Sequence, residues 1–167
     1  MNLIGVVLLA PTILAVYSVL RGDNEAYAAF GTILFFVGMA VYLANSRAIP
    51  MLSLSGQYAS ATTDAQRSLL IAAGQAMLAE GQGRAGVPLI ELASLIISVV
   101  MLRGKVFSKA TAYAGILGNV LLMAVEVVLT LIRGLPNWGM AIAVGAGISM
   151  MTWNFLVGRR LLQLGQL

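Results

Sequence analysis

The fold is decided by the stretch ATAYAGILGNVLLMAVEVVLTLI, residues 110–132, in which Glu126 is the only charged side chain. A helix that crosses the hydrocarbon core of a bilayer needs roughly 20 apolar residues, because each residue advances the helix by about 1.5 Å. This stretch has that length, and turn-forming residues follow it at 133–137. We therefore predict a transmembrane helix over residues 110–132.

The rest of the chain has the same character. Hydrophobic residues make up 60% of the 167 positions and charged residues only 10%. Soluble domains are about 45–50% apolar and about 25% charged. A soluble protein with this composition could not cover its surface with polar groups, so the solvent that suits the chain is a lipid bilayer.

Four further apolar segments are long enough to span. They are residues 3–20, 27–44, 86–102 and 138–157. Pro11 lies near the middle of the first and should kink it, whereas Pro88 lies in the first turn of the third, where proline is tolerated. A short polar turn, residues 21–25, separates the first two segments. The fold class predicted is all-α, a polytopic transmembrane helix bundle of about five spans.

The longest polar stretch, residues 46–85, contains one predicted helix. Thr63 and Gln66 form the pattern of a capping box, which predicts a helix over residues 64–80. Its apolar part, residues 68–79, is too short to cross a bilayer. We therefore expect an extramembrane helix that is interfacial or re-entrant.

The positions of the cations predict the topology. With five spans, one side of the membrane holds six cations and the other holds four. The six are Arg21, Arg103, Lys105, Lys109, Arg159 and Arg160, and the four are Arg47, Arg67, Arg84 and Arg133. Because cytoplasmic loops are enriched in Lys and Arg, the C-terminus is expected in the cytoplasm. If residues 68–79 also crossed, the split would be seven to three, again with a cytoplasmic C-terminus.

The composition also limits the chemistry. The chain has no cysteine and no histidine, so thiolate metal sites, Fe–S clusters and the usual haem ligand are excluded. The methionines show no repeated spacing typical of copper sites. No catalytic constellation is visible, so we expect neither an enzyme nor a protein with a metal or cofactor. The basic residues flank apolar segments, which argues against nucleic-acid binding.

Two acidic residues lie inside predicted spans, Glu91 and Glu126. Intramembrane carboxylates are costly, so they are candidate functional residues. Their depths place both in the same outer leaflet, where they could share a proton or a cation. Alternatively, they could reach the interface or pair with Arg84 and Arg133. Asn119, near the middle of its span, is a further candidate for the same ligand or proton site or for a bond across a helix interface.

Small residues predict where helices pack. Gly139, Ala143 and Gly147 recur every four residues, and Ala114 and Gly118 do the same on the preceding span. Such rows allow close approach by another helix of this chain or of a partner. Trp138, Trp153 and Tyr27 are predicted to lie in aromatic belts at the membrane interfaces.

Several segments resemble a bacterial family of multi-span membrane proteins of unknown function. The similarity is carried by Leu54-Ser55-Gly56-Gln57-Tyr58, Val100-Met101-Leu102-Arg103, residues 105–110, and the closing segment 153–160. This resemblance implies a helical fold and a location in the bacterial cell membrane. It implies no activity.

Two functions remain open at this stage. One is an accessory or structural subunit that packs into a larger membrane complex without a redox centre of its own, or into a homo-oligomer. The other is a small oligomeric transporter, channel or ligand-binding membrane protein that uses Glu91 and Glu126. The orientation of these two carboxylates distinguishes them, because a cavity between them favours the second.

Overall fold

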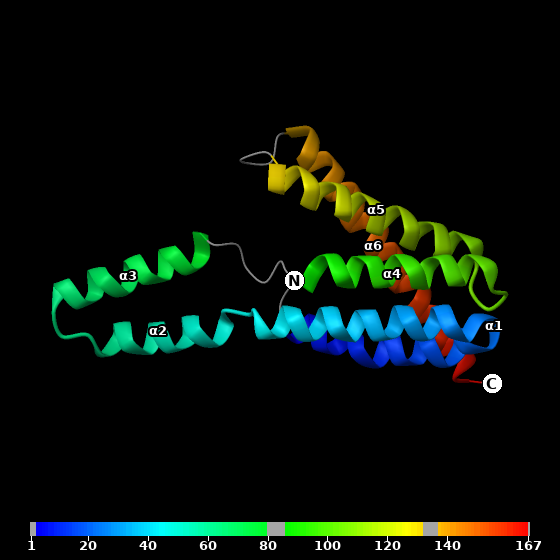
Figure 1. The fold of residues 1–167 in the computed structure, drawn as a ribbon, viewed down its shortest axis with the longest axis horizontal. Helices are drawn as coiled ribbons and strands as arrows, with labels where there is room; N and C mark the ends of the chain where they lie inside the picture. The colour runs from blue at the N-terminus through cyan, green and yellow to red at the C-terminus, as the bar shows by residue number, and fades with distance from the viewer. Residues whose placement is uncertain (1–2, 80–85, 132–136, 167) are drawn as a thin grey trace.

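The computed structural model describes residues 3–79, 86–131 and 137–166. These residues form helices and no strands, as the all-α prediction requires. In chain order the helices are α1 (Leu3–Ala44), α2 (Ala48–Ser60), α3 (Asp64–Ala79), α4 (Val87–Arg103), α5 (Lys109–Leu131) and α6 (Asn137–Leu164). Helix α1 packs on α4, α4 on α5 and α5 on α6, and these helices form the bundle seen in Figure 1.

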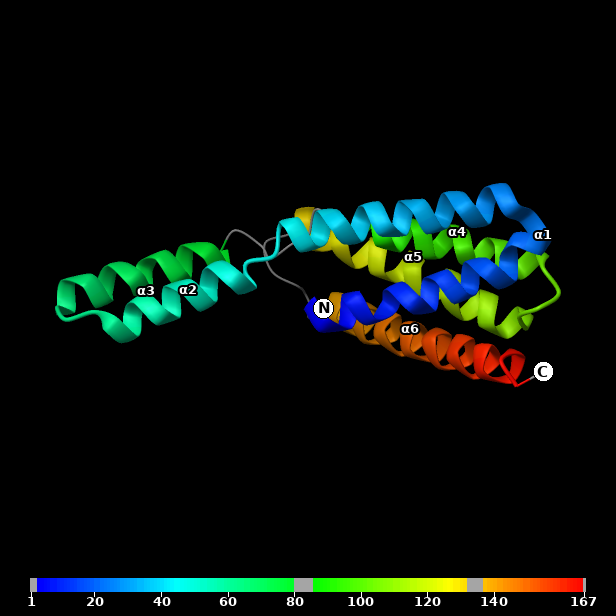
Figure 2. The ribbon, with the colours of Figure 1, turned by 90° about the horizontal axis from the view of Figure 1, so that it is seen from below.

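Helix α1 is bent back on itself at Asn24. This residue has non-helical dihedral angles, φ −159° and ψ 91°, and Figure 2 shows the two arms running in opposite directions from it. The Asn24 side-chain oxygen accepts a hydrogen bond from the Tyr27 backbone N–H at 3.3 Å, so Asn24 caps the second arm. The predicted polar turn over residues 21–25 is thus reduced to one residue, because a capping asparagine starts the new helix immediately.

The outer surface of the bundle is apolar. Exposed side chains include Leu8, Ile33, Ile148 and Met151, and Met151 is 75% exposed. Segments Gly5–Ser60, Lys109–Val128 and Trp138–Leu164 are long and apolar enough to cross a membrane. Helix α4, with 17 residues, is at the short end of the usual length of a span. Exposed apolar side chains carry no free-energy penalty when they contact lipid instead of water. The apolar outer surface and the long helices therefore indicate a helical membrane bundle.

Glycines bring α1 close to α4. A Cβ on Gly38 would lie 2.9 Å from the Ile90 backbone nitrogen and from the Leu89 Cβ. A Cβ on Gly86, just before α4, would meet the Gly38 carbonyl oxygen and the Tyr42 backbone. The two backbones therefore approach each other at a distance that no side chain allows, as at other small-residue contacts in membranes.

Helices α2 and α3 form a hairpin that lies beyond one end of the bundle (Figures 1 and 2). Helix α3 begins at Asp64, where the capping pattern places it, and the Gln66 backbone N–H donates to the Thr63 hydroxyl at 3.3 Å. Helix α2 was not predicted. Pro50 is its third residue, in the first turn where proline needs no helical N–H donor. The Arg47 guanidinium donates to the Met77 carbonyl and joins the base of the hairpin.

We predict that Gly38→Ala destabilises the bundle by about 1–3 kcal/mol, because the new methyl group has backbone atoms against it that cannot move aside. Thermal unfolding in detergent measures the effect. Gly56→Ala on α2 is the matched control, because a Cβ there meets nothing within 4 Å and alanine favours a helix. Equal losses of stability in the two variants would contradict the close contact between α1 and α4.

Candidate functional site

A cavity of about 680 Å³ lies within the bundle. Both arms of α1, together with α4, α5 and α6, contribute to its wall, and Leu78 adds one contact from α3. It reaches Tyr42 and Val87, at the end of the bundle where α1 ends and α4 begins. The cavity is therefore enclosed by helices that are distant in sequence.

Glu91 and Glu126 both line this cavity. Glu91 is in the second turn of α4 and Glu126 in the last two turns of α5, so the antiparallel helices place them toward the same end of the bundle. Glu91 is only 6% exposed, and its Oε2 atom has no hydrogen-bond partner among the described residues. Arg84 and Arg133, the predicted alternative partners, lie outside the described residues. The structure thus brings the two carboxylates to one space.

Aromatic and polar side chains complete the wall. Phe35, Tyr42 and Trp153 supply rings, while Thr12 and Ser94 supply hydroxyl groups. The Trp153 indole Nε1 is buried without a hydrogen-bond partner among the described residues. This nitrogen lies against Gly115 of α5, which does not line the cavity, so Trp153 contributes its ring and not its N–H donor to the wall.

The other half of the bundle is filled. Val16 and Leu20 of α1, Ile97 and Met101 of α4, and Val157 of α6 are all at most 1% exposed. These side chains lie toward the bend at Asn24 and the ends of α4 and α6, away from Tyr42 and Val87. The cavity is therefore closed toward the end of the bundle that carries the C-terminus (Figure 1).

Comparison with known proteins places the chain in a family. Residues 1–158 match the family described as Domain of unknown function (DUF4386). The chain belongs to the DUF4386 family. The match agrees with the resemblance inferred from the sequence, and it covers every helix that lines the cavity. No curated protein and no solved structure matches the chain.

Asn119 of the DUF4386 chain does not line the cavity, although it is fully buried. Its side-chain Nδ2 donates to the Gly115 carbonyl of the same helix at 2.7 Å, and its Oδ1 atom has no partner among the described residues. The structure therefore separates Asn119 from the two carboxylates with which the sequence analysis grouped it.

The small residues have different surroundings. A Cβ on Gly118 would lie 2.8 Å from the Met150 sulfur of α6, so α5 and α6 meet closely there. Ala114 packs on the core, Gly139 is buried and Ala143 is partly exposed. Gly147 lines the cavity, and a Cβ there meets nothing within 4 Å. The row on α6 is thus interrupted at Gly147, where open space replaces the predicted helix contact.

Trp153 corrects the predicted aromatic belt. It is 3% exposed and part of the core, whereas Trp138 and Tyr27 are exposed. Its indole lies against Gly115 of α5, because a Cβ at that position would be 2.5 Å from Nε1 and 2.6 Å from Cδ1 of the ring. The contact depends on a glycine in another helix, so nothing in the sequence around Trp153 indicates it.

We predict that a cysteine at Gly147 reacts with a small water-soluble methanethiosulfonate, because this position opens into the cavity. Labelling followed by mass spectrometry is unambiguous, since the chain contains no other cysteine. Ala146→Cys is the matched control on the neighbouring position, which is 0% exposed and should react far more slowly. Equal rates at both positions would contradict a cavity that opens at Gly147.

Proposed function

We propose that this protein binds small organic cations in the central cavity, and that binding is the first step of their transport or sensing at the membrane. The observation that carries the proposal is that Glu91, Glu126 and three aromatic residues line one cavity. This is the arrangement under which the sequence analysis favours a ligand-binding or transport protein over an accessory subunit.

The electrostatics favour a positively charged ligand. A carboxylate buried among membrane helices is costly unless something compensates its charge. Two carboxylates that face one cavity repel each other when both are ionised, and a shared proton or a cation between them removes that repulsion. The structure therefore favours occupation of this end of the cavity by a cation.

The walls favour an organic cation with an apolar body. Phe35, Tyr42 and Trp153 supply aromatic rings, a residue type that attracts cations, and the surrounding leucine, isoleucine and valine side chains supply apolar surface. Ligand pockets of about 300–1,000 Å³ accommodate drug-sized molecules. A cavity of about 680 Å³ fits a cation of that size better than a hydrated metal ion.

The proposed orientation puts the cavity mouth outside the cell. Arg103, Lys105, Lys109, Arg159 and Arg160 belong to the end of the bundle with the C-terminus, and Arg21 precedes the bend at that same end. The excess of cations at that end argues for the cytoplasmic face of the cell membrane. The open end near Tyr42 and Val87 would then face the exterior.

The accessory-subunit role stays a second candidate, supported by the hairpin. Ile49 and Leu52 of α2 and Leu69 of α3 are more than 70% exposed at the outer end of the protein. Apolar side chains outside the bundle are typical of surfaces that contact another protein or the membrane surface. Extraction in mild detergent, followed by mass spectrometry of what co-migrates, tests this role. A stoichiometric partner complex would support it, and a protein that migrates alone would exclude it.

We predict that Glu91→Gln and Glu126→Gln each weaken the binding of tetraphenylphosphonium by at least about tenfold. Two unit charges about 8 Å apart interact by about 2 kcal/mol at an effective dielectric constant near 20, and each 1.4 kcal/mol is tenfold in affinity. Equilibrium binding to the purified protein in nanodiscs measures the change. The same variants should reduce any flux of this cation into proteoliposomes.

Glu25→Gln is the matched control, because it removes an exposed carboxylate at the opposite end of the bundle from the cavity mouth. The affinity of this variant for tetraphenylphosphonium should equal that of the unaltered protein. If binding and flux were unchanged in the Glu91 and Glu126 variants, the proposal would be wrong.

A further inference from the structure

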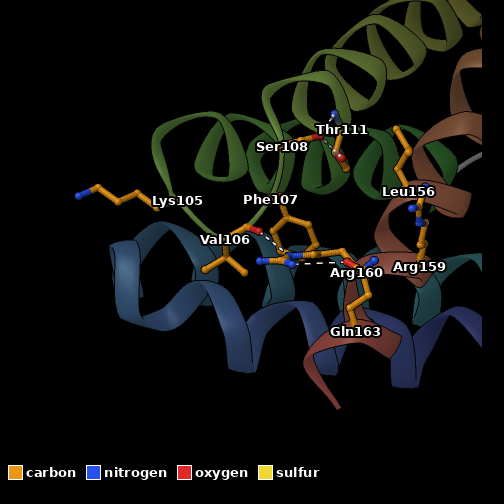
Figure 3. A pocket seen from close by; sticks show the side chains of 9 residues that line it. All are labelled: Lys105, Val106, Phe107, Ser108, Thr111, Leu156, Arg159, Arg160 and Gln163. Carbon is orange, nitrogen blue, oxygen red and sulfur yellow. Dashed lines mark hydrogen bonds between the residues drawn. The ribbon is translucent and has the colours of Figure 1, made fainter. Parts of the chain in front are cut away.

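A second pocket lies at the other end of the bundle, and the proposed function does not use it. It has a volume of about 410 Å³ and is formed by the segment between α4 and α5, the first turn of α5 and the last turns of α6. Figure 3 shows the nine side chains that line it. The residues come from segments about fifty positions apart in the chain, so the pocket is a product of the fold.

The pocket is strongly basic. Lys105, Arg159 and Arg160 line it, and no lining residue is acidic. Within residues 3–79, 86–131 and 137–166, no carboxylate lies within ion-pair distance of these three cations. A neighbouring pocket at the same end differs, because Asp23 accompanies Arg103 there. The uncompensated charge is thus particular to the basic pocket.

Hydrogen bonds hold Arg160 in place across the pocket. Its Nε donates to the Val106 carbonyl at 2.9 Å, and a terminal nitrogen donates to the Gln163 side chain at 3.4 Å (Figure 3). A guanidinium has five N–H donors, so further donors are left for an anion. Lys105 and Arg159 are exposed, and their side chains stand at opposite edges of the pocket in Figure 3.

The beginning of α5 adds to the positive potential. The Ser108 hydroxyl accepts a hydrogen bond from the Thr111 backbone N–H at 3.2 Å and lies 2.9 Å from the Thr111 hydroxyl. Ser108 thereby caps the helix, and both residues line the pocket. The positive end of the helix dipole and two hydroxyl groups therefore belong to the wall of the same pocket as the three cations.

We propose that this pocket binds the phosphate headgroup of an anionic phospholipid. Phosphate is the group that arginine, lysine, hydroxyl donors and a helix N-terminus recognise together. A lipid fits better than a free anion, because Leu156 lines the pocket and apolar side chains continue from it over the outer surface of α6. Among these, Phe155 is 69% exposed and Leu162 is 72% exposed. They offer contact surface for acyl chains beside the headgroup.

The position of the basic pocket agrees with the proposed topology, and this agreement does not depend on the central cavity. Anionic lipids are concentrated in the cytoplasmic leaflet, and basic pockets between helices on that side bind their headgroups. The pocket is at the end of the bundle with the excess of cations, opposite the mouth near Tyr42 and Val87. Arg160 already links α6 to the segment between α4 and α5. The bound lipid would hold the same two parts together.

The test measures lipid retention by native mass spectrometry on the full chain in detergent, after incubation with phosphatidylglycerol or phosphatidylcholine. We expect the unaltered protein to retain phosphatidylglycerol preferentially. The double variant Lys105→Gln with Arg159→Gln should retain it about thirtyfold less, which corresponds to about 2 kcal/mol for the loss of two cations near one headgroup. Arg160 is left intact, because its bonds to Val106 and Gln163 support the fold.

Lys109→Gln is the matched control, because it removes an exposed cation at the same end that does not line the pocket. Its retention of phosphatidylglycerol should be unchanged, and thermal unfolding should show that all variants are folded. Equal retention of the two lipids by the unaltered protein, or equal retention by the double variant, would overturn the proposal. Saturable binding of inorganic phosphate that abolishes lipid retention would reassign the pocket to a free anion.

Discussion

Lipid cannot hydrogen-bond, so each polar group that a membrane helix carries inward must be satisfied within the protein or by something that the protein binds. This constraint governs the interior of the bundle. Most inward hydroxyl and amide groups meet it locally, as when the Ser98 hydroxyl donates to the Ser94 carbonyl. Among the described residues, four buried side-chain atoms lack a partner, namely Thr32 Oγ1, Glu91 Oε2, Asn119 Oδ1 and Trp153 Nε1. Of these four residues, Glu91 and Trp153 line the cavity. A ligand with a cationic group would compensate the charge of the Glu91 carboxylate, whose Oε2 atom has no partner among the described residues.

The packing of the bundle explains why that cavity exists at one end only. Toward the bend at Asn24, buried side chains from α1, α4 and α6 fill the interior of the bundle, and the pockets at that end are separate from the cavity. Toward the other end, Gly147 presents no side chain to the interior. The small residue leaves open volume there. At Gly38 the same residue type has the opposite effect, because it allows the backbones of α1 and α4 to touch. Position relative to a neighbouring helix, and not residue type alone, decides which effect a glycine has.

Much of this could be predicted from composition and spacing. Apolar length predicts most helix ends of the bundle to within one or two residues, although α6 continues to Leu164, seven residues past the predicted end at 157. The depths of Glu91 and Glu126 in antiparallel spans predict that they lie at the same end. The capping oxygen of Thr63 marks the start of α3. These features depend on residues close in sequence or on helix geometry, which the sequence states directly.

The remaining features depend on contacts between distant residues. The reversal at Asn24 requires knowing that its side chain caps the next helix and does not simply belong to a loop. Helix α2 has no side-chain cap at its start and no buried residue, so no capping pattern marks it in the sequence. Trp153 is buried because a glycine in α5 leaves room for its ring. The basic pocket forms because α6 packs against the segment that precedes α5. Such pairs become visible only when the helices are placed in space.

The central claim is that the cavity selects its ligand by positive charge. Tetraphenylphosphonium and tetraphenylborate have nearly the same size and shape and opposite charge. Comparing how the two ions bind to the unaltered protein therefore isolates the contribution of ligand charge to affinity. Saturable binding measured in nanodiscs should be found for the cation and be absent for the anion. If both ions bound with similar affinity, or if only the anion bound, Glu91 and Glu126 would not determine what the cavity accepts.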